Sequence, residues 1–448
     1  MKKKVAFITL GCKVNQYETN AMIEQFMGSG YKIVESIEKS DVYVVNTCTV
    51  TNMSDRKSRQ MLRKVKELNQ NSIVVACGCY AQVAKKELEK IDEIDIIIGN
   101  NEKKDIINIV EGFLNSQDSN IESDLSLKYS KVDEILNQKE FVDFGEVLYT
   151  DKSRAVIKVQ DGCDRYCTYC IIPYARGRVR SRKPESIISE IKKISNTGIK
   201  EVVITGIHIA SYGKDFKEEY RLIDLLEEIN KIDNIKRIRL GSIEPLLITK
   251  EFIQRLKKLD KICEHFHLSI QSGSDETLKR MNRRYRVSDL EEVVNLLRKT
   301  YKDVILTTDI IVGFPDESEK EFEETYEFLK KIKLYKLHVF KYSPRKGTKA
   351  ANMKNQIDGN EKEKRSKLLL ELSDKYELMY NKENIDKEHE ILIEEERDGY
   401  YIGHTKNYIL AKCKIDDTEK EKISNLENKI VKVKGVFSNK ESVIVERV

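Results

Sequence analysis

The sequence predicts an α/β protein in three parts: an N-terminal open parallel α/β domain, a central partial barrel of six β/α units, and a small C-terminal β-barrel. Short apolar runs alternate with helical patterns in the first part of the chain, and this alternation resumes after a polar stretch. Near the C-terminus the pattern changes to alternating apolar and polar residues interrupted by glycines, which is typical of strands in a small barrel. We expect an N-terminal domain over 1–115, a linker over 116–148, a central unit over 149–380 and the C-terminal barrel over 381–448.

Length and composition restrict the possible functions. The chain has 448 residues, 40% of them hydrophobic, which suffices for two or three domains with their own cores. Its apolar runs are too short for a membrane span or a signal peptide, so we expect a cytoplasmic protein. Nine cysteines in such a chain indicate metal binding or catalysis rather than disulfides. The net charge of +5 says little about a nucleic-acid partner, so local clusters of basic residues matter more.

Cysteines follow the strands expected in the N-terminal domain. Strands are expected at 5–10, 42–46, 73–76 and 94–98, with helices at 17–27, at 54–68 and from about 103. Cys12, Cys48 and Cys79 each follow one of the first three strands, beside glycine, asparagine or threonine. Because the carboxyl ends of parallel strands meet at one edge, we expect a three-cysteine cluster there, with burial of small residues as the alternative. Cys77 lies within its strand and is expected to pack, although it could compete as a ligand.

Six strand–helix units are expected in the central part. The strands are expected at 155–159, 201–205, 237–240, 267–270, 304–311 and 336–340. The helices between and after them are expected at 184–197, 222–230, 250–259, 287–301 and 320–332, and a charged helix at 357–383. Each strand leads into a polar or glycine-containing loop, as in barrels whose chemistry occurs at the carboxyl ends of the strands. Six units rather than eight predict a barrel that stays open.

Three further cysteines follow the first strand of the central unit. Cys163, Cys167 and Cys170 are spaced C-x3-C-x2-C. Three thiolates can hold three irons of a cubane 4Fe-4S cluster and leave the fourth iron free to bind a small molecule. Structural zinc is the competing interpretation, but it requires four ligands, and the first histidine of the chain is His208. The stretch resembles the signature of radical S-adenosylmethionine (SAM) enzymes, in which the open iron binds the methionyl group of SAM and an electron yields a 5′-deoxyadenosyl radical.

Nearly the whole chain resembles the methylthiotransferase family of radical SAM enzymes. The matching stretches are TLGCKVNQ at 9–16, NTCTV at 46–50, GCYAQ at 78–82, the Cys163 loop, HLSIQSG at 267–273 and DIIVGFP at 309–315. The resemblance implies two 4Fe-4S clusters and SAM, a radical SAM core and a C-terminal TRAM barrel. It assigns the second cluster to Cys12, Cys48 and Cys79, with Cys79 chosen over Cys77 by the Gly-Cys-x-Ala-Gln match. It also implies that the second cluster carries or supplies the sulfur, which one SAM methylates. A second SAM gives the radical that abstracts the target hydrogen, and the carbon then couples to the sulfur.

The form of the first cysteine motif indicates a substrate. GCKVNQYE at 11–18 resembles the branch that acts on N6-threonylcarbamoyladenosine at position 37 of tRNA. Other branches modify isopentenyladenosine in tRNA or an aspartate of a ribosomal protein, and both stay open as alternatives. The resemblance implies the tRNA anticodon stem-loop as a partner and a flavodoxin- or ferredoxin-type protein as electron donor. A metal-stabilised RNA-binding protein without enzymatic activity is the alternative from another class.

Basic runs are candidates for contacts with RNA. One run follows the Cys163 loop and comprises Arg176, Arg178, Arg180, Arg182 and Lys183. Further basic residues are Arg280, Arg283, Arg284 and Arg286 in the central unit and Lys406, Lys412, Lys432 and Lys434 in the C-terminal barrel. Such residues can bind phosphates, although a solvated surface is the ordinary alternative for a run of charges.

Five residues are candidates for binding SAM or substrate. They are Tyr169, Gly206, Glu244, Gln271 and Arg283. Gly206 occupies the position where the second core strand meets the methionyl group in the family, but the usual Gly-Gly-Glu is absent here. The remaining cysteines, Cys263 and Cys413, are expected to be structural, and His265 and His267 are expected to pack or bond to backbone rather than bind metal.

Overall fold

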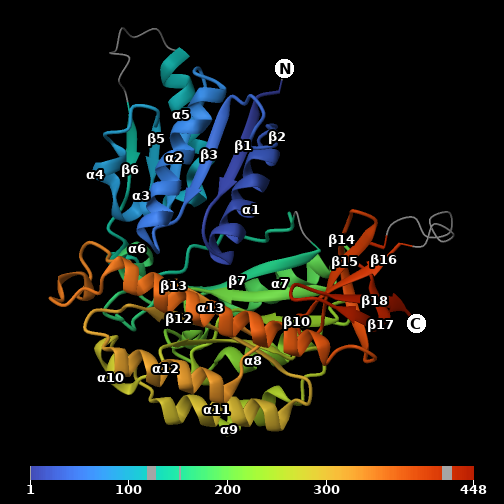
Figure 1. Ribbon diagram of the computed structural model, residues 1–448. Coiled ribbons are helices and arrows are strands. Elements are labelled where there is room, and N and C mark those ends of the chain that lie inside the picture. The colour runs from blue at the N-terminus through green and yellow to red at the C-terminus, as the bar shows by residue number, and fades with distance from the viewer. Residues whose placement is uncertain (1, 119–127, 151–152, 416–425) are drawn as a thin grey trace.

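The computed structural model describes residues 2–118, 128–150, 153–415 and 426–448 (Figure 1). An N-terminal α/β domain lies above a central α/β unit, and a small β-barrel packs against one side of the central unit (Figure 1). The predicted fold class is confirmed. Residues 119–127 of the expected linker lie outside the described residues. No helix within the described ranges combines the length and the apolar character needed to cross a membrane.

The N-terminal domain is built on a parallel sheet of six strands in the order β2-β1-β3-β4-β5-β6. The strands are β1 (Lys4–Thr9), β2 (Lys32–Val34), β3 (Val42–Thr47), β4 (Ile73–Gly78), β5 (Ile96–Ile98) and β6 (Tyr129–Lys131). The helices are α1 (Lys13–Gly28), α2 (Asn52–Leu68), α3 (Cys79–Val83), α4 (Lys85–Leu88) and α5 (Ile106–Asp118), with a 3-10 turn η1 (Glu102–Asp105). The central strands β3 and β4 are buried along their whole length, because helices cover both faces of the sheet.

The two edge strands of this sheet were not predicted. Strands β2 and β6 have three residues each and keep exposed positions, so they carry no clear apolar period. Strand β6 and the turn η2 (Ile135–Asn137) lie inside the expected linker, so part of that segment completes the N-terminal sheet instead.

The central unit contains six parallel strands in an open arrangement, as predicted. The strands are β7 (Arg154–Asp161), β9 (Glu201–Gly206), β10 (Arg237–Leu240), β11 (His265–Gln271), β12 (Ile305–Val312) and β13 (Lys336–Lys341), with a short antiparallel β8 (Arg180–Ser181). They form two hydrogen-bonded sheets, β10-β9-β7-β8 and β11-β12-β13. Isolated bridges between Ile238 and Ile262 and between Ile243 and Leu268 join them.

Helices cover the outside of these strands. They are α6 (Ile172–Arg176), α7 (Pro184–Ser195), α8 (Leu222–Asn230), α9 (Lys250–Leu256), α10 (Asp275–Arg280), α11 (Val287–Thr300), α12 (Glu319–Ile332) and α13 (Gly359–Lys382). Three 3-10 turns, η3 (Ile209–Ser211), η4 (Pro245–Leu247) and η5 (Ala350–Asn352), lie in the loops. Side chains alternate along each strand, so in β11 Phe266 and Leu268 pack in the apolar core while the intervening residues face the barrel interior.

The C-terminal part is a closed five-stranded barrel, as predicted. Its strands are β14 (Glu388–Arg397), β15 (Tyr400–Thr405), β16 (Leu410–Lys414), β17 (Ile430–Ser438) and β18 (Val443–Arg447). Arg237 of β10 donates to the backbone oxygens of His404 at 3.0 Å and Glu390 at 2.7 Å. The Tyr408 ring lies under the guanidinium of Arg239, 4.5 Å from the ring centroid. These contacts fix the barrel against the amino-terminal ends of the core strands.

Candidate active site

The cysteines of the N-terminal domain lie together at the carboxyl ends of three adjacent strands. Cys12 follows β1, Cys48 follows β3, and Cys79 begins α3 directly after β4. The pKa of Cys48 is raised to about 11, mainly by burial and in smaller part by the thiols of Cys79 and Cys12. The three strands are adjacent in the sheet, and none of the three thiols forms a disulfide. The structure therefore brings together the three residues predicted to hold the second cluster.

Two glycines allow the cysteine loops to approach each other. Gly11 has φ of 99°, and a Cβ at this position would lie 2.8 Å from the Cβ and Sγ of Cys48. Gly78 has φ of 96°, and its Cβ would lie 2.5 Å from the backbone oxygen of Thr47. A side chain at either position would be strained and would push two cysteine loops apart. Glycine is thus required where the strands turn toward the cysteines.

Cys77 faces a different environment from Cys79. Its thiol is fully buried in β4 and lies 3.7 Å from the backbone oxygen of Val45, to which it can donate. Burial raises its pKa to about 12. A thiol that packs inside a sheet is a poor ligand, in agreement with the expected packing role.

The cysteines of the central unit lie on one loop after β7. Burial raises the pKa of Cys170 to about 12, and the neighbouring Cys167 and Cys163 add to this rise. The backbone of the loop is anchored by a hydrogen bond from the Cys163 amide to the Gly177 oxygen at 3.0 Å. The Thr168 amide donates to the Met281 oxygen at 3.1 Å, which ties the loop to α10.

Both cysteine trios fit iron–sulfur cubanes better than single metal ions. Within the described ranges, no three Cys, His, Asp or Glu side chains surround one metal-ion position. A cubane places each cysteine on a different iron, so its ligands need not converge on one point. Structural zinc would require four ligands around one ion. Three free thiols without a fourth ligand therefore suit a cluster with one open iron at each site.

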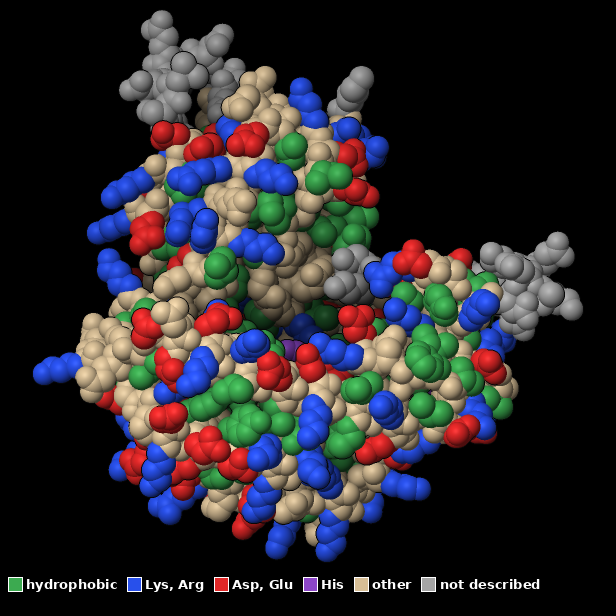
Figure 2. All heavy atoms as spheres, in the orientation of Figure 1, with side chains coloured by type: hydrophobic (Ala, Val, Ile, Leu, Met, Phe, Trp, Pro, Cys, Tyr) green, Lys and Arg blue, Asp and Glu red, His purple; other side chains and the backbone are tan. Residues whose placement is uncertain are grey.

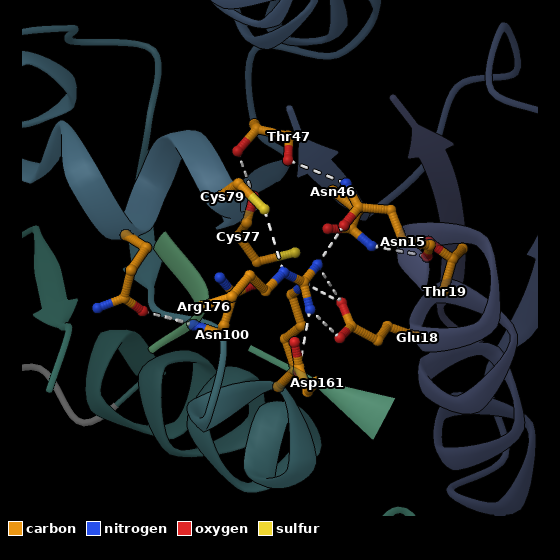
Figure 3. Close-up of polar contacts among 12 residues, drawn as sticks. Asn15, Glu18, Thr19, Asn46, Thr47, Cys77, Cys79, Asn100, Asp161 and Arg176 are labelled. Carbon is orange, nitrogen blue, oxygen red and sulfur yellow. Dashed lines mark hydrogen bonds and ion pairs between the residues drawn. The ribbon is translucent and has the colours of Figure 1, made fainter. Parts of the chain in front are cut away.

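Arg176 connects the two cysteine regions, although it belongs to the helix α6 that follows the Cys163 loop. It is fully buried, and its Nε donates to Sγ of Cys79 at 3.2 Å (Figure 3). Its Nη2 donates to Oδ1 of Asn15 at 2.5 Å and to Oε2 of Glu18 at 3.0 Å. Nη1 binds the other carboxylate oxygen of Glu18 and lies 3.3 Å from Asp161. One guanidinium therefore bridges the N-terminal domain and the first strand of the core.

The charges around Arg176 are unequal. The buried ion pairs join the cations Lys103, Lys158, Arg176 and Arg180 to the carboxylates Glu18 and Asp161. Burial alone would raise the pKa of Glu18, but the surrounding cations outweigh it and hold this pKa well below its usual range. Four cations face two carboxylates, so the network has an excess of positive charge. This excess fits a negatively charged cluster on that side.

The predicted phosphate contacts of the first basic run are wrong for three residues. Arg176, Arg180 and Arg182 are among the most deeply buried side chains of the described chain. Arg182 lies 3.0 Å from both the hydroxyl of Tyr17 and a carboxylate oxygen of Glu190. These arginines join the two domains and are not available to RNA, whereas Arg178 and Lys183 are exposed.

Three of the five predicted cofactor residues surround the Cys163 loop. The Arg283 guanidinium donates to the Tyr169 hydroxyl at 2.6 Å and lies 5.8 Å from its ring centroid. Glu244 pairs with Arg165, and Nε2 of His208 lies 3.2 Å from its carboxylate. Burial would raise the pKa of Glu244, yet the pKa is lowered because these positive or donating neighbours outweigh burial. Arg165 and His208 were not predicted, although both stand in loops that follow core strands.

Gly206 and Gln271 end two of the core strands. A Cβ at Gly206 would lie 3.0 Å from Gln160 of the neighbouring strand, so this glycine permits close packing of β7 and β9. Gln271 is buried and has φ of 71°, beside a register shift in the pairing of β11 with β12. Their positions at carboxyl strand ends agree with a cofactor site, while contact with a cofactor stays a prediction.

The other basic groups divide between the surface and local pairs. Arg280 pairs with Glu321 at 2.8 Å, whereas Arg284 and Arg286 are exposed.

A basic surface that was not predicted lies on α2, directly after the Cys48 loop. Its exposed residues are Arg56, Lys57, Gln60, Arg63 and Lys64. The run DRKSRQMLRKVK could have identified this surface, because its basic residues recur every three or four positions.

Comparisons with known proteins show which families and folds the chain is similar to. Residues 157–329 match the model of the Radical SAM superfamily, and residues 4–99 match that of the uncharacterized protein family UPF0004. The chain is 40% identical to the threonylcarbamoyladenosine tRNA methylthiotransferase MtaB of Bacillus subtilis, over 96% of this chain and 93% of that protein. It is 42% identical to the protein of the same name from Aquifex aeolicus, over 88% of this chain and 93% of that protein. In fold it is similar to the radical SAM methyltransferase TsrM of Kitasatospora setae, with a TM-score of 0.55 and 14% identity over 77% of each chain.

Proposed function

The chain belongs to the methylthiotransferase family of radical SAM enzymes, and on that premise we propose that it converts N6-threonylcarbamoyladenosine at position 37 of tRNA to its 2-methylthio derivative. The names of the two relatives specify this substrate for those proteins. The observation that carries the proposal is the placement of two cysteine trios in adjoining domains, with Arg176 reaching from one to the other.

Two 4Fe-4S clusters and SAM supply the chemistry of this family: a 5′-deoxyadenosyl radical from one site and a methylatable sulfur at the other. We infer that Cys163, Cys167 and Cys170 hold the first cluster. The residues Cys12, Cys48 and Cys79 hold the second. Two clusters with open irons explain why one chain carries two trios of thiols, each without a fourth protein ligand.

Side chains around the Cys163 loop would hold SAM and exclude water. Glu244 is a carboxylate kept ionised by its neighbours, which suits the amino group of the methionyl part. Arg283 donates to the Tyr169 hydroxyl and would offer its buried, unpaired Nε to a polar group of the ligand. Gly206 and Gln271 border the same end of the barrel and contribute backbone and amide groups.

The RNA partner would be the anticodon stem-loop of tRNA. We place the enzyme in the cytoplasm, where tRNA is used. The exposed basic residues of α2 lie beside the Cys48 loop and suit its phosphates. In the C-terminal barrel, Lys432 and Lys434 are exposed and are further candidates. A flavodoxin- or ferredoxin-type protein would supply the electron.

The test is anaerobic reconstitution followed by reaction with defined substrates. The protein with both clusters, SAM and dithionite should form 5′-deoxyadenosine and convert a stem-loop containing N6-threonylcarbamoyladenosine to the methylthio product, detected by nucleoside mass spectrometry. Modification of an isopentenyladenosine stem-loop instead, or of a ribosomal-protein aspartate, would refute the substrate. Zinc without iron in the purified protein would refute the enzymatic class.

A further inference from the structure

A cavity of about 480 Å3 opens beside Lys13, the residue that follows Cys12. Its walls come from the inner faces of β11, β12 and β13, the loop after β10, and the β15–β16 region of the C-terminal barrel. Sites for small ligands commonly enclose about 300–1,000 Å3. Figure 2 shows a hollow between the N-terminal domain and the rest of the molecule, with a histidine and basic side chains at its floor.

Histidines are concentrated in this cavity. Four of the six histidines of the chain line it: His265, His267, His338 and His404. His265 and His267 share the inner face of β11, because residues two apart on a strand point the same way. The same strand ends at Gln271, after a register shift in its pairing with β12. The cavity therefore lies on a strand whose carboxyl end borders the proposed SAM site.

Most ionic groups of the cavity are already paired. His267 lies between the Thr307 hydroxyl at 2.8 Å and the Asp309 carboxylate at 3.1 Å. Lys336 pairs with Glu377 at 2.9 Å. Glu441 lines the cavity from the C-terminal barrel and is exposed to solvent. Each acidic group of the lining thus has a polar partner or is exposed to solvent.

Lys13 differs from these groups. Lys13 is exposed, and no ion pair or hydrogen bond of its ammonium is found among the described residues. Nδ1 of the buried His265 has no hydrogen-bond partner either. Burial would raise the pKa of Tyr408, yet this pKa is lowered because the cations Arg154 and Lys13 outweigh burial. The part of the cavity next to Cys12 therefore has a positive potential and, among the described residues, polar groups without a protein partner.

A ligand that satisfies these groups must carry an anion and further polar atoms. An isopentenyl group offers no anion to the Lys13 ammonium and no polar atom to Nδ1 of the buried His265, which would stay unpaired at a cost in free energy that selects against this group. A threonylcarbamoyl group carries a carboxylate, a hydroxyl and ureido N–H groups. We propose that this cavity is the subsite for the amino-acid part of the N6-threonylcarbamoyl group, with Lys13 binding its carboxylate. This inference rests on the proposed function and explains how the enzyme distinguishes its substrate from other modified adenosines.

The experiment compares two stem-loops that differ in one group. One carries N6-threonylcarbamoyladenosine, and the other carries its carboxamide, in which the carboxylate is neutral. We expect the reconstituted wild-type enzyme to bind the acid about tenfold more tightly than the amide, as for loss of one charged hydrogen bond. Lys13→Gln should bind both equally and as weakly as the wild type binds the amide, while Lys13→Arg should keep the preference.

Lys39→Gln is the matched control, because Lys39 is an exposed lysine before β3, at the opposite end of the same sheet. It should bind both stem-loops as the wild type does. Iron and sulfide are measured in every variant, since Lys13 adjoins Cys12. Retention of the full acid preference by Lys13→Gln would overturn the proposal. If that variant loses iron, equal binding of acid and amide by the wild type would overturn it. Failure of the wild type to methylthiolate the acid stem-loop would instead refute the proposed function.

Discussion

The Nε atom of Arg176 lies 3.2 Å from Sγ of Cys79, although the two residues belong to different domains. Arg176 lies six residues after Cys170, the last cysteine of the loop that would hold the radical cluster. Its guanidinium is also held by Glu18 and Asp161, so its position is fixed on three sides (Figure 3). The loop of one cluster is thereby attached to a ligand of the other.

We expect Arg176→Met to lower the reduction potential of the second cluster. An N–H···S hydrogen bond stabilises the more negative, reduced state of an iron–sulfur cluster. Its loss should shift the potential by on the order of 50 mV, since 59 mV corresponds to a tenfold change for one electron. The measurement is a redox titration followed by electron paramagnetic resonance, with Cys163, Cys167 and Cys170 replaced by alanine.

Arg180→Met is the matched control for this prediction. Arg180 is buried in the same ion network, 3.8 Å from Asp161, but its guanidinium donates to Asn101 and to the backbone oxygen of Arg176 rather than to Cys79. It should leave the potential unchanged. Equal shifts in both variants would show that net charge, and not the bond to sulfur, sets the potential.

Substitution of Cys79 and substitution of Cys77 should differ sharply in their effect on the iron content of the protein. We expect Cys79→Ala to lose about half of the iron and sulfide of the reconstituted protein, because one of two equal clusters loses a ligand. Cys77→Ala should retain all of it, since the Cys77 thiol faces the backbone of β3. Iron and sulfide assays on both variants decide the assignment. A loss of iron in Cys77→Ala with none in Cys79→Ala would exchange their roles.

The positions of the cysteines could be predicted because each follows a strand, and the strand order brings these strand ends together. Three apolar runs, each followed by a cysteine, suffice to place Cys12, Cys48 and Cys79 at one sheet edge. Helix α8 was predicted with its observed bounds because its apolar period is strong. The burial of Arg176 could not be predicted, since its partner Glu18 is distant in sequence and a run of arginines normally indicates a surface. The short edge strands and the cavity beside Lys13 likewise depend on tertiary packing.

We expect Glu18→Gln to destabilise the protein strongly. Glu18 is buried and binds Arg176, Lys103 and Lys158, so its neutralisation leaves Asp161 as the remaining carboxylate of a network with four buried cations. Removal of one partner from a buried ion network typically costs about 3–5 kcal/mol. Thermal unfolding should show a large fall in midpoint. The control Asp303→Asn removes an exposed pair with Lys387 and should change little, and equal effects would contradict this view of the network.

Stability should decrease with acidity because of His265. Burial, together with the nearby charge of Arg239, holds the pKa of His265 well below its usual range. The folded protein therefore keeps this ring neutral, while the unfolded chain takes up a proton below about pH 6.5. Between pH 6.5 and 5 the unfolded state binds more protons, so stability falls by up to about 1.4 kcal/mol per pH unit. His265→Gln should have a correspondingly flatter profile in urea unfolding, and an unchanged slope would contradict the prediction.

The basic surface of α2 should set the salt dependence of tRNA binding. Arg56 and Arg63 are exposed on the helix that begins after the Cys48 loop, so phosphates of a bound stem-loop can reach them. Each phosphate contact releases counterions, and its loss should reduce the slope of log K against log salt by about one. We expect Arg56→Gln and Arg63→Gln to weaken binding in low salt and to converge on the wild type as salt rises.

Arg255→Gln on α9 is the control, because Arg255 pairs with Asp224 at 2.7 Å on another face of the molecule. Since neither change touches the cavity beside Lys13, the preference for the carboxylate over the carboxamide should persist in all three variants. A variant that lost this preference along with the salt slope would show that the two surfaces do not act separately.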